Sequence, residues 1–398
     1  MVYLAVLVSL LQGISMRGAK ILVSLSALGA GATPFQVGVL AATFAAFPLL
    51  LAVYAGKISD RFGVRRPILA GAAVIALGIA LPLAVPGIAG LIACAALVGL
   101  GHIFFHVSIH NLIGAYGEGE ARTRNFATFA LGASIGAFIG PSLGGISIDF
   151  WGFRATHALL AAIALLPAAV LLARPQLVPK RAPQTKADAA GGSMELLRDA
   201  GLRRTLLMSG AALTGIELFT FYFPVYGRSV GLSASAIGLV MSCYAVAAFL
   251  VRMGMPRATR RMGEVGVLTA SLFMAGATYL LVPLVSQAPM LALIAFLLGI
   301  SLGCAQPLTI ILTYNHAPAG RSGEALGMRL TVNKLTQILV PLAFGAMGSA
   351  FGLIPVFWAN GAFLITGGFL SLAERKISAA RDAAAAAALA RQQEEEEP

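Results

Sequence analysis

The stretch PILAGAAVIALGIALPLAVPGIAGLIACAALVGLGHIFFHVSIHNLIGAYG, from Pro67 to Gly117, contains no Asp, Glu, Lys or Arg. An uncharged run of this length suffices for two membrane crossings, because one helix needs about 20 apolar residues to span the hydrocarbon core. The segment AVPG, which ends at Gly87, is a suitable turn between the two crossings. Further uncharged runs cover residues 21–56, 125–148 and 155–173. The pattern predicts a chain that crosses a membrane many times.

The composition agrees with a membrane protein. Hydrophobic residues make up 58% of the 398 residues and charged residues only 11%, whereas a soluble domain carries about 25% charged residues. The net charge is +12, but the basic residues form short clusters between apolar runs. That distribution is typical of charges that orient membrane helices. We therefore expect a lipid bilayer around the chain and no nucleic acid partner.

The apolar runs predict an all-α membrane protein with twelve transmembrane helices in two six-helix bundles related by pseudo-symmetry. The expected domains are an N-terminal bundle (1–173), a cytoplasmic linker (174–202), a C-terminal bundle (203–373) and a cytoplasmic tail (374–398). The predicted spans are 2–28, 35–55, 67–85, 87–115, 125–148, 155–173, 203–227, 234–254, 264–284, 289–315, 323–348 and 353–373.

The distribution of Lys and Arg predicts the orientation of these spans. The loops on one side, together with the tail, hold 22 of the 28 basic residues, if Arg252 is counted there. The opposite loops hold only Arg154 and Arg228. Because positive charge stays on the cytoplasmic side, both termini should be cytoplasmic. We expect a monomer in a bacterial inner membrane.

The two halves align at an offset of 200 residues. The offset pairs Gly31 with Gly231, Gly38 with Gly238, Gly63 with Gly263, Pro141 with Pro341, and Gly145 with Gly345. Parallel six-helix repeats are a known transporter plan, with the substrate site between the halves near the middle of the membrane. The alignment predicts such a site here.

The loop GKISDRFGVRR, from Gly56 to Arg66, resembles the signature loop between helices 2 and 3 of the major facilitator superfamily, and the resemblance extends over essentially the whole chain. It implies secondary active transport by alternating access. It also implies a conformational latch, in which Asp60 caps a neighbouring helix and pairs with an Arg. The latch residues would be Gly56, Asp60, Arg61, Gly63 and Arg65. The second half has Arg260 where the first has Asp60, so the latch should belong to the first half.

The segment GASIGAFIGPSLGG, from Gly132 to Gly145, resembles the helix 5 motif of proton-coupled exporters in this superfamily. Its small residues recur every four positions, a pattern that allows close helix packing in membranes, and a proline permits a bend. The motif residues are Gly132, Gly136, Gly140, Pro141 and Gly145. The resemblance favours efflux, and generic helix packing is the alternative.

Ionisable and polar residues inside predicted spans are candidates for function, because burying them in a membrane is costly. Arg17 and Glu217 are equivalent under the offset of 200, so they should approach from opposite halves. Glu217 is the proton-coupling carboxylate, a structural partner of Arg17, or a carboxylate that is simply solvated in the cavity. The full set of candidates for substrate binding or coupling is Arg17, Lys20, His102, His106, Glu217, Tyr222, Gln306, Arg329, Asn333 and Lys334.

These candidates indicate the kind of cargo. His102, His106 and His110 project from one helix over about 12 Å, too far for one ion, so we expect neither a metal site nor a cofactor. Four cations against one carboxylate favour an organic anion or amphipathic acid as the small-molecule substrate, with protons as the coupling ion. The alternatives are a proton-coupled multidrug exporter of neutral or cationic compounds, or a proton symporter that imports a carboxylate. No motif of an intramembrane enzyme is present.

Overall fold

The computed structural model describes residues 2–114, 119–173, 198–317 and 321–373, and within these ranges it contains helices and no strand. The predicted linker (174–202) lies almost entirely outside these ranges, and the tail (374–398) lies wholly outside them. The helices are α1 (Val2–Gly29), α2 (Pro34–Phe62), α3 (Arg65–Ala84), α4 (Ile88–Gly114), α5 (Gly119–Ala173), α6 (Ala200–Ser229), α7 (Ala234–Leu281), α8 (Ala288–Gly303), α9 (Ala305–Asn315) and α10 (Ser322–Phe351), with a 3₁₀ turn at Val282–Leu284.

Ten helical segments in the described ranges are long and apolar enough to cross a membrane, including a last one at Leu353–Ala373. Two of them, Thr128–Ala173 and Ala234–Leu284, are 46 and 51 residues long. Each contains one glycine with non-helical backbone angles, Gly152 in α5 and Gly263 in α7. The protein is therefore an all-helical, multi-pass membrane protein, as predicted.

The turns repeat at the offset of 200. Gly31 and Gly231 have φ angles of 82° and 84°, and Gly152 and Gly352 have 78° and 84°. A positive φ suits glycine, which lacks the β-carbon that disfavours this region. Thr33 and Ser233 follow the first pair, and each accepts a hydrogen bond from the backbone at the start of the next helix. Such caps satisfy N–H groups that have no partner inside the helix.

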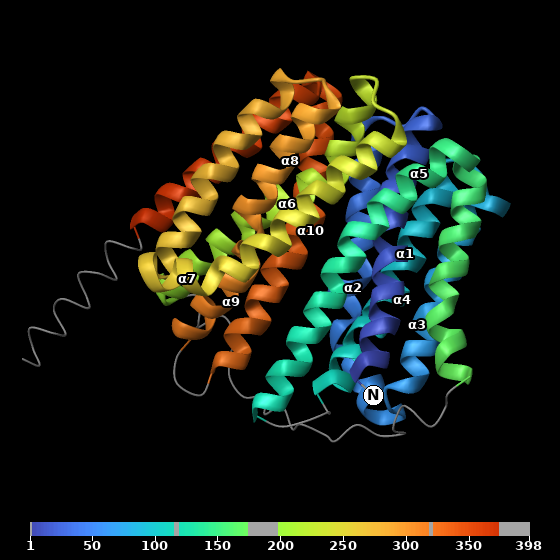
Figure 1. The fold of residues 1–398 in the computed structure, drawn as a ribbon, viewed down its shortest axis with the longest axis horizontal. Helices are drawn as coiled ribbons and strands as arrows, with labels where there is room; N and C mark the ends of the chain where they lie inside the picture. Colours follow the sequence, from blue (N-terminus) through green and yellow to red (C-terminus); the bar gives the residue numbers. More distant parts are fainter. Residues whose placement is uncertain (1, 115–118, 174–197, 318–320, 374–398) are drawn as a thin grey trace, which may run out of the picture.

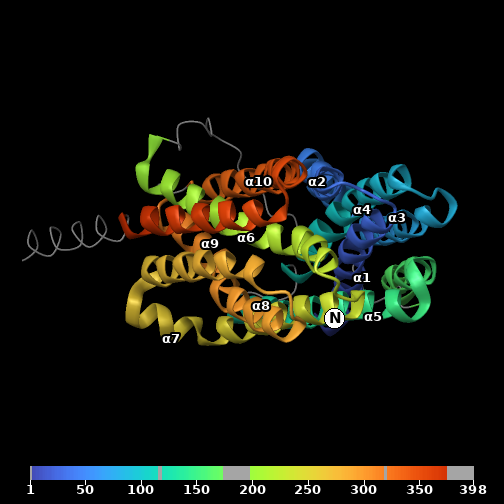
Figure 2. The ribbon, with the colours of Figure 1, turned by 90° about the horizontal axis from the view of Figure 1, so that it is seen from above.

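The helices form two groups in space. Helices α1–α5 lie on one side of the molecule and α6–α10 on the other (Figures 1 and 2). The groups touch at the end away from the N-terminus. A β-carbon at Gly38 of α2 would overlap the carbonyl oxygen of Pro341 of α10, and one at Gly238 of α7 would overlap that of Pro141 of α5. The aligned glycines and prolines thus form two equivalent contacts between the groups.

The glycine stripe of α5 packs against α1. A β-carbon at Gly132 would lie 2.6 Å from Val6 Cγ1, and one at Gly140 would lie 2.8 Å from the carbonyl oxygen of Ile14. Gly136 is nearly as close to the backbone of α1. This close packing is what the spacing of four predicts. Gly145 faces the other helix group, and a β-carbon at this position would overlap the carbonyl oxygen of Ala234.

The predicted loop at Gly56–Arg66 is mostly helical, although the apolar span of α2 ends at Ala52, close to the predicted residue 55. Helix α2 continues to Phe62, and the turn occurs at Gly63, whose φ is 76°. The polar residues of this segment do not end the helix, because a helix can extend beyond the membrane into water. Arg61 lies over the Phe62 ring at 5.3 Å, and Arg65 donates to the carbonyl oxygen of Leu171 at 3.4 Å. The side chain of Asp60 lies outside the described part of the structure.

Candidate functional site

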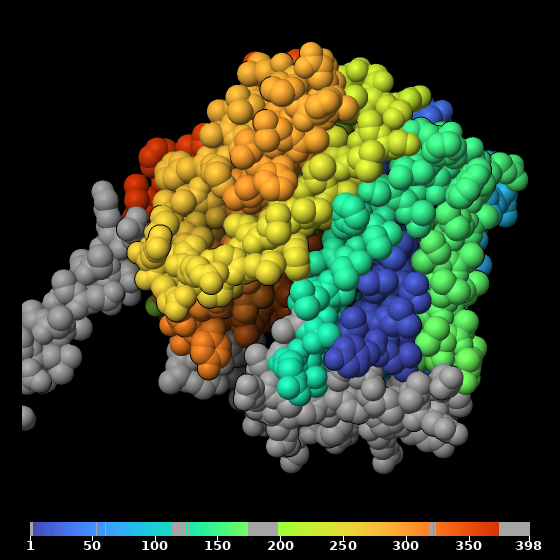
Figure 3. Space-filling model, viewed as in Figure 1, coloured from blue at the N-terminus to red at the C-terminus, as the bar shows by residue number. Residues whose placement is uncertain are grey.

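A central cavity of about 320 Å³ lies between the two helix groups. Residues of α1 and α5 line one wall, and residues of α6, α7, α8 and α9 line the other. Figure 3 shows the surface hollowed between α5 and the orange helices of the second group. Four predicted residues meet here: Arg17, Lys20, Glu217 and Gln306.

The cavity carries more positive than negative charge. Its lining contains Arg17, Lys20 and Arg252 but only one carboxylate, Glu217. Arg17 donates from Nη1 to the carbonyl oxygen of Ala133 at 3.0 Å, and Arg252 donates from Nε to that of Gly303 at 2.8 Å. Backbone carbonyls hold these two side chains but do not cancel their charge. A net positive, partly desolvated cavity attracts anions strongly, because Coulomb energies grow as the local dielectric constant falls.

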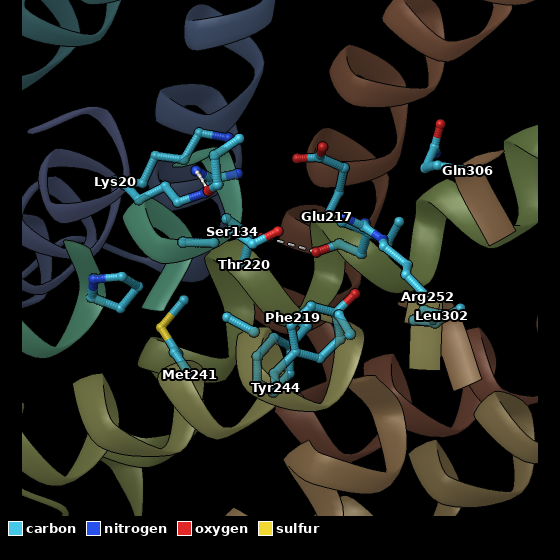
Figure 4. Close-up of a pocket in the computed structure, with 17 residues that line it drawn as sticks. Lys20, Ser134, Glu217, Phe219, Thr220, Met241, Tyr244, Arg252, Leu302 and Gln306 are labelled. Atoms are coloured by element: carbon cyan, nitrogen blue, oxygen red, sulfur yellow. Dashed lines mark hydrogen bonds between the residues drawn. The ribbon is translucent and has the colours of Figure 1, made fainter. Parts of the chain in front are cut away.

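Glu217 reaches into the space between Lys20 and Gln306 (Figure 4). It is only 5% exposed, and it makes no hydrogen bond or ion pair with another residue of the described ranges. In particular, no ion pair joins it to Arg17, although both line the cavity. Lys334 of α10 lies close enough to this carboxylate to interact with it electrostatically.

Aromatic rings contribute to the same cavity. Phe219 stacks on Tyr244 with ring centroids 4.7 Å apart, and both rings line the cavity. Lys20 lies over the ring of Phe221, with its Nζ 5.0 Å from the centroid. The cavity therefore offers cations, one carboxylate and ring faces within a single space.

A side cavity of about 270 Å³ lies between α1, α4 and α5 and shares Arg17, Lys20 and Ala133 with the central cavity. The predicted residues His102 and His106 line it. Their rings are 5.1 Å apart, and the His106 and His110 rings are 4.3 Å apart, so the three imidazoles follow one another along α4. The described residues contain no group of three His, Cys, Asp or Glu side chains that could hold a metal ion.

The Major Facilitator Superfamily profile matches the chain in two overlapping segments, residues 5–232 and 205–393. The chain belongs to this superfamily. It is a secondary transporter for a small molecule, embedded in a membrane, and it is not an enzyme.

Relatives of this superfamily member are distant. An uncharacterized MFS-type transporter of Methanocaldococcus jannaschii is 19% identical over 86% of this chain and 89% of its own. The human vesicular acetylcholine transporter is 33% identical, but over only 35% of this chain and 26% of its own. A multidrug resistance protein, Stp, of Mycobacterium tuberculosis is 36% identical over 28% of this chain and 21% of its own.

Solved structures share the fold of this transporter. A POT family transporter in complex with 5-aminolevulinic acid superimposes with a TM-score of 0.77 at 16% identity, over 94% of this chain and 95% of its own. A bacterial homologue of the human lysosomal transporter Spinster gives 0.77 at 15% identity, over 94% and 96%. At these identities the likeness concerns the fold alone.

Four predicted site residues of this transporter line neither cavity. Tyr222 is fully buried, and its hydroxyl donates to the carbonyl oxygen of Pro341 at 2.5 Å. Five residues separate Tyr222 from Glu217, which turns it about 140° around the helix, so it faces α10. Arg329 donates to Gln306 and Thr309, Asn333 accepts from Ser209, and Lys334 donates to Gln337.

Arg252 and Gln12 are cavity residues that were not among the predicted site residues. Arg252 was predicted at the cytoplasmic end of the span 234–254 and counted with the charges of that side, but α7 stays helical to Met262, and Arg252 lines the central cavity. Gln12 lies in an otherwise apolar part of α1 and lines the side cavity. The sequence did contain a signal for Gln12. It lies eight residues before Lys20, and residues 12, 16 and 20 share one face of the helix.

Proposed function

We propose that this transporter moves an organic anion or amphipathic acid by alternating access, coupled to protons, in the direction of efflux. The observation that carries this proposal is the charge of the central cavity, where three cations face a single buried carboxylate. An anionic cargo relieves the repulsion among Arg17, Lys20 and Arg252. Glu217 then serves as the proton site, because it is the one carboxylate among the described residues that line the cavity.

The proposed architecture has twelve crossings in two six-helix bundles, residues 1–173 and 203–373, with both termini cytoplasmic in a bacterial inner membrane. The breaks at Gly152 and Gly263 support it, because each divides a span far too long for one crossing. A monomer suffices, since the cavity is built from one chain. The latch assigned to Gly56, Asp60, Arg61, Gly63 and Arg65 rests on the resemblance alone.

Efflux is supported by the glycine stripe of α5 and its resemblance to the exporter motif, together with the partial similarity to a multidrug resistance protein. A second candidate is export of a cationic amine. Glu217, the stacked rings of Phe219 and Tyr244, and the partial similarity to a vesicular acetylcholine transporter favour it. The count of cavity charges favours the anion.

The test is transport by purified protein in liposomes with an imposed pH gradient and the membrane potential clamped. The panel contains labelled aromatic and aliphatic carboxylates, the matching primary amines and a quaternary ammonium compound. We expect gradient-driven movement of carboxylates, and a large loss of it in Lys20→Gln. The exposed Arg228 of α6 provides the control Arg228→Gln, which should transport normally.

Movement of amines alone would contradict the anion proposal and favour the second candidate. Direction is tested in intact cells. Efflux predicts that cells producing the protein accumulate less labelled acid than cells producing Lys20→Gln, and that a protonophore abolishes the difference. Greater accumulation in producing cells would contradict efflux and indicate import.

A further inference from the structure

The side cavity between α1, α4 and α5 is lined by polar groups that lack partners. Gln12 is 2% exposed, and neither of its amide atoms has a hydrogen-bond partner among the described residues. The same holds for Ser9 Oγ and His102 Nδ1. All three residues line the cavity. Buried polar groups are nearly always hydrogen-bonded, and one left without a partner costs about 1–3 kcal/mol.

The equivalent place in the other helix group is built differently. At the offset of 200, Ser209 corresponds to Ser9, and its hydroxyl donates to Asn333 Oδ1 at 3.0 Å. Arg329 donates to Gln306 Oε1 at 2.7 Å and to Thr309 Oγ1 at 2.9 Å. There the polar side chains satisfy one another across the helices.

The first group has lost these internal partners. Arg329 corresponds to Phe129, and Asn333 corresponds to Ala133. A phenyl ring and a methyl group cannot hydrogen-bond to Ser9 or Gln12. The first group therefore has Ser9 in common with the second, adds Gln12 and His102 where the second has Ala212 and Leu302, and has apolar side chains where the second has the partners Arg329 and Asn333.

The side cavity also opens onto the cations of the central cavity. Arg17 and Lys20 line both spaces. Along the axis of α1, Arg17 lies roughly 8 Å from Gln12, and Lys20 lies roughly 12 Å from it. An elongated molecule can therefore place one end at the cations and the other at Gln12.

We propose that the side cavity is a substrate subsite, which binds an uncharged hydrogen-bonding group, such as a carboxamide, at the far end of an elongated organic anion. This inference rests on the proposed function and specifies its cargo further. Gln12 is suited to a carboxamide, because its own amide donates and accepts in the same plane. His102 and Ser9 add further hydrogen-bonding atoms. Phe105 and Phe129 also line the cavity, where they would contact the hydrocarbon part of the substrate. The cations hold the charged end.

The test compares two acids that differ only at the far end. Monoamides of linear dicarboxylic acids with six to eight carbons are matched with analogues in which an isopropyl group replaces the carboxamide. Binding to the detergent-purified protein is measured by calorimetry or by competition, so that proton coupling does not enter. We expect the wild-type protein to prefer the amide at least tenfold. Gln12→Met should abolish the preference.

Two further variants separate a subsite from a structural role. Ser9→Ala should reduce the amide preference severalfold, whereas the matched Ser209→Ala should leave it unchanged. Gln12→Met should not lower the melting temperature of the ligand-free protein, because it removes polar atoms that have no partner. A lower melting temperature with an intact amide preference would overturn the proposal and make Gln12 structural.

A second pair of probes, primary amines with the same two far ends, separates failure of the subsite from failure of the anion proposal. If amines bind and acids do not, the anion proposal fails, and the amine pair then decides the subsite by the same comparison with Gln12→Met. If the wild type binds the amide and isopropyl compounds equally in both pairs, or binds none of them, the side cavity holds only water and the subsite is wrong.

Discussion

The carbonyl oxygen of Pro141 in α5 faces Gly238 in α7 so closely that a β-carbon at Gly238 would overlap it. The same relationship recurs between Pro341 in α10 and Gly38 in α2. These contacts join the two helix groups at the end away from the N-terminus (Figure 1). A transporter that works by alternating access must break these two contacts when the opposite side opens. Mutations at the contacts should therefore change the relative populations of the two states.

Gly238→Ala should shift that balance. The added methyl group cannot fit against a backbone carbonyl, so the helices must move apart, and we expect the variant to lose most of its transport. The control is Gly254→Ala in the same helix, where nothing lies within 4 Å of the added atom. That change should be neutral or stabilise the helix by up to about 1 kcal/mol.

Closure at this contact can be measured separately from transport. Ser142 Oγ and Ser242 Oγ lie 2.6 Å apart across the two groups. In a background without Cys94, Cys243 and Cys304, paired cysteines at positions 142 and 242 should cross-link readily, and Gly238→Ala should reduce the yield. An unchanged yield with normal transport would contradict a role for this contact in the cycle.

Asp149 should hold the same end closed by a different interaction. Its carboxylate accepts from the backbone N–H of Ala234 at 3.1 Å and from that of Ser235 at 2.7 Å, at the start of α7. A negative charge at a helix N-terminus contributes about 0.3–1 kcal/mol, and here it comes from the other group. We expect Asp149→Asn to reduce cross-linking between positions 142 and 242.

The control for Asp149→Asn is a change at Ser233, which caps the N-terminus of the same helix α7 but belongs to the same helix group as α7. Ser233 Oγ accepts from the N–H of Ala236 at 3.1 Å. Ser233→Ala should lower thermal stability slightly and leave the cross-linking yield unchanged. Equal effects of the two variants on the yield would mean that Asp149 acts only on helix stability.

Much of the fold could be predicted from the sequence, because apolar runs and glycine turns are local signals. Gly31, Gly63 and their partners 200 residues later all occur at turns. The extension of α2 through Gly56 to Phe62 could not be predicted, because hydropathy detects where the membrane ends and not where the helix ends. For the same reason Arg252 was counted with the charges of the cytoplasmic side, although it lines the cavity.

The site was harder to predict than the fold. Arg17, Lys20 and Glu217 were found because charges in apolar helices are rare. The sequence could not tell that Arg329 bonds within its own group, since helical spacing fixes the face of a side chain but not its neighbour. Gln12 was missed for a related reason. An uncharged amide is common in membrane helices, and only the structure reveals that its partners are absent.

Glu217→Gln should separate transport from its driving force. The amide keeps the shape of the side chain but cannot exchange a proton, so we expect exchange of labelled acid between equal pools to continue. Accumulation driven by a pH gradient should fall at least tenfold. Both are measured in liposomes. Glu264→Gln, which changes a carboxylate that does not line the cavity, should retain accumulation. Gradient-driven accumulation at the wild-type level in Glu217→Gln would exclude Glu217 as the proton site.

Arg329→Met should destabilise the protein without changing its affinity for cargo. Arg329 is 3% exposed, and its guanidinium donates to Gln306 Oε1 at 2.7 Å and to Thr309 Oγ1 at 2.9 Å. Hydrogen bonds from a charged group contribute about 1.5–3 kcal/mol each, and removing the donor leaves two buried acceptors unsatisfied. We expect the melting temperature to fall by several degrees and the KM of the surviving protein to stay within about twofold of the wild type. Lys20→Gln should do the reverse, because Lys20 lines the central cavity. A raised KM with an unchanged melting temperature in Arg329→Met would instead assign Arg329 to the binding site.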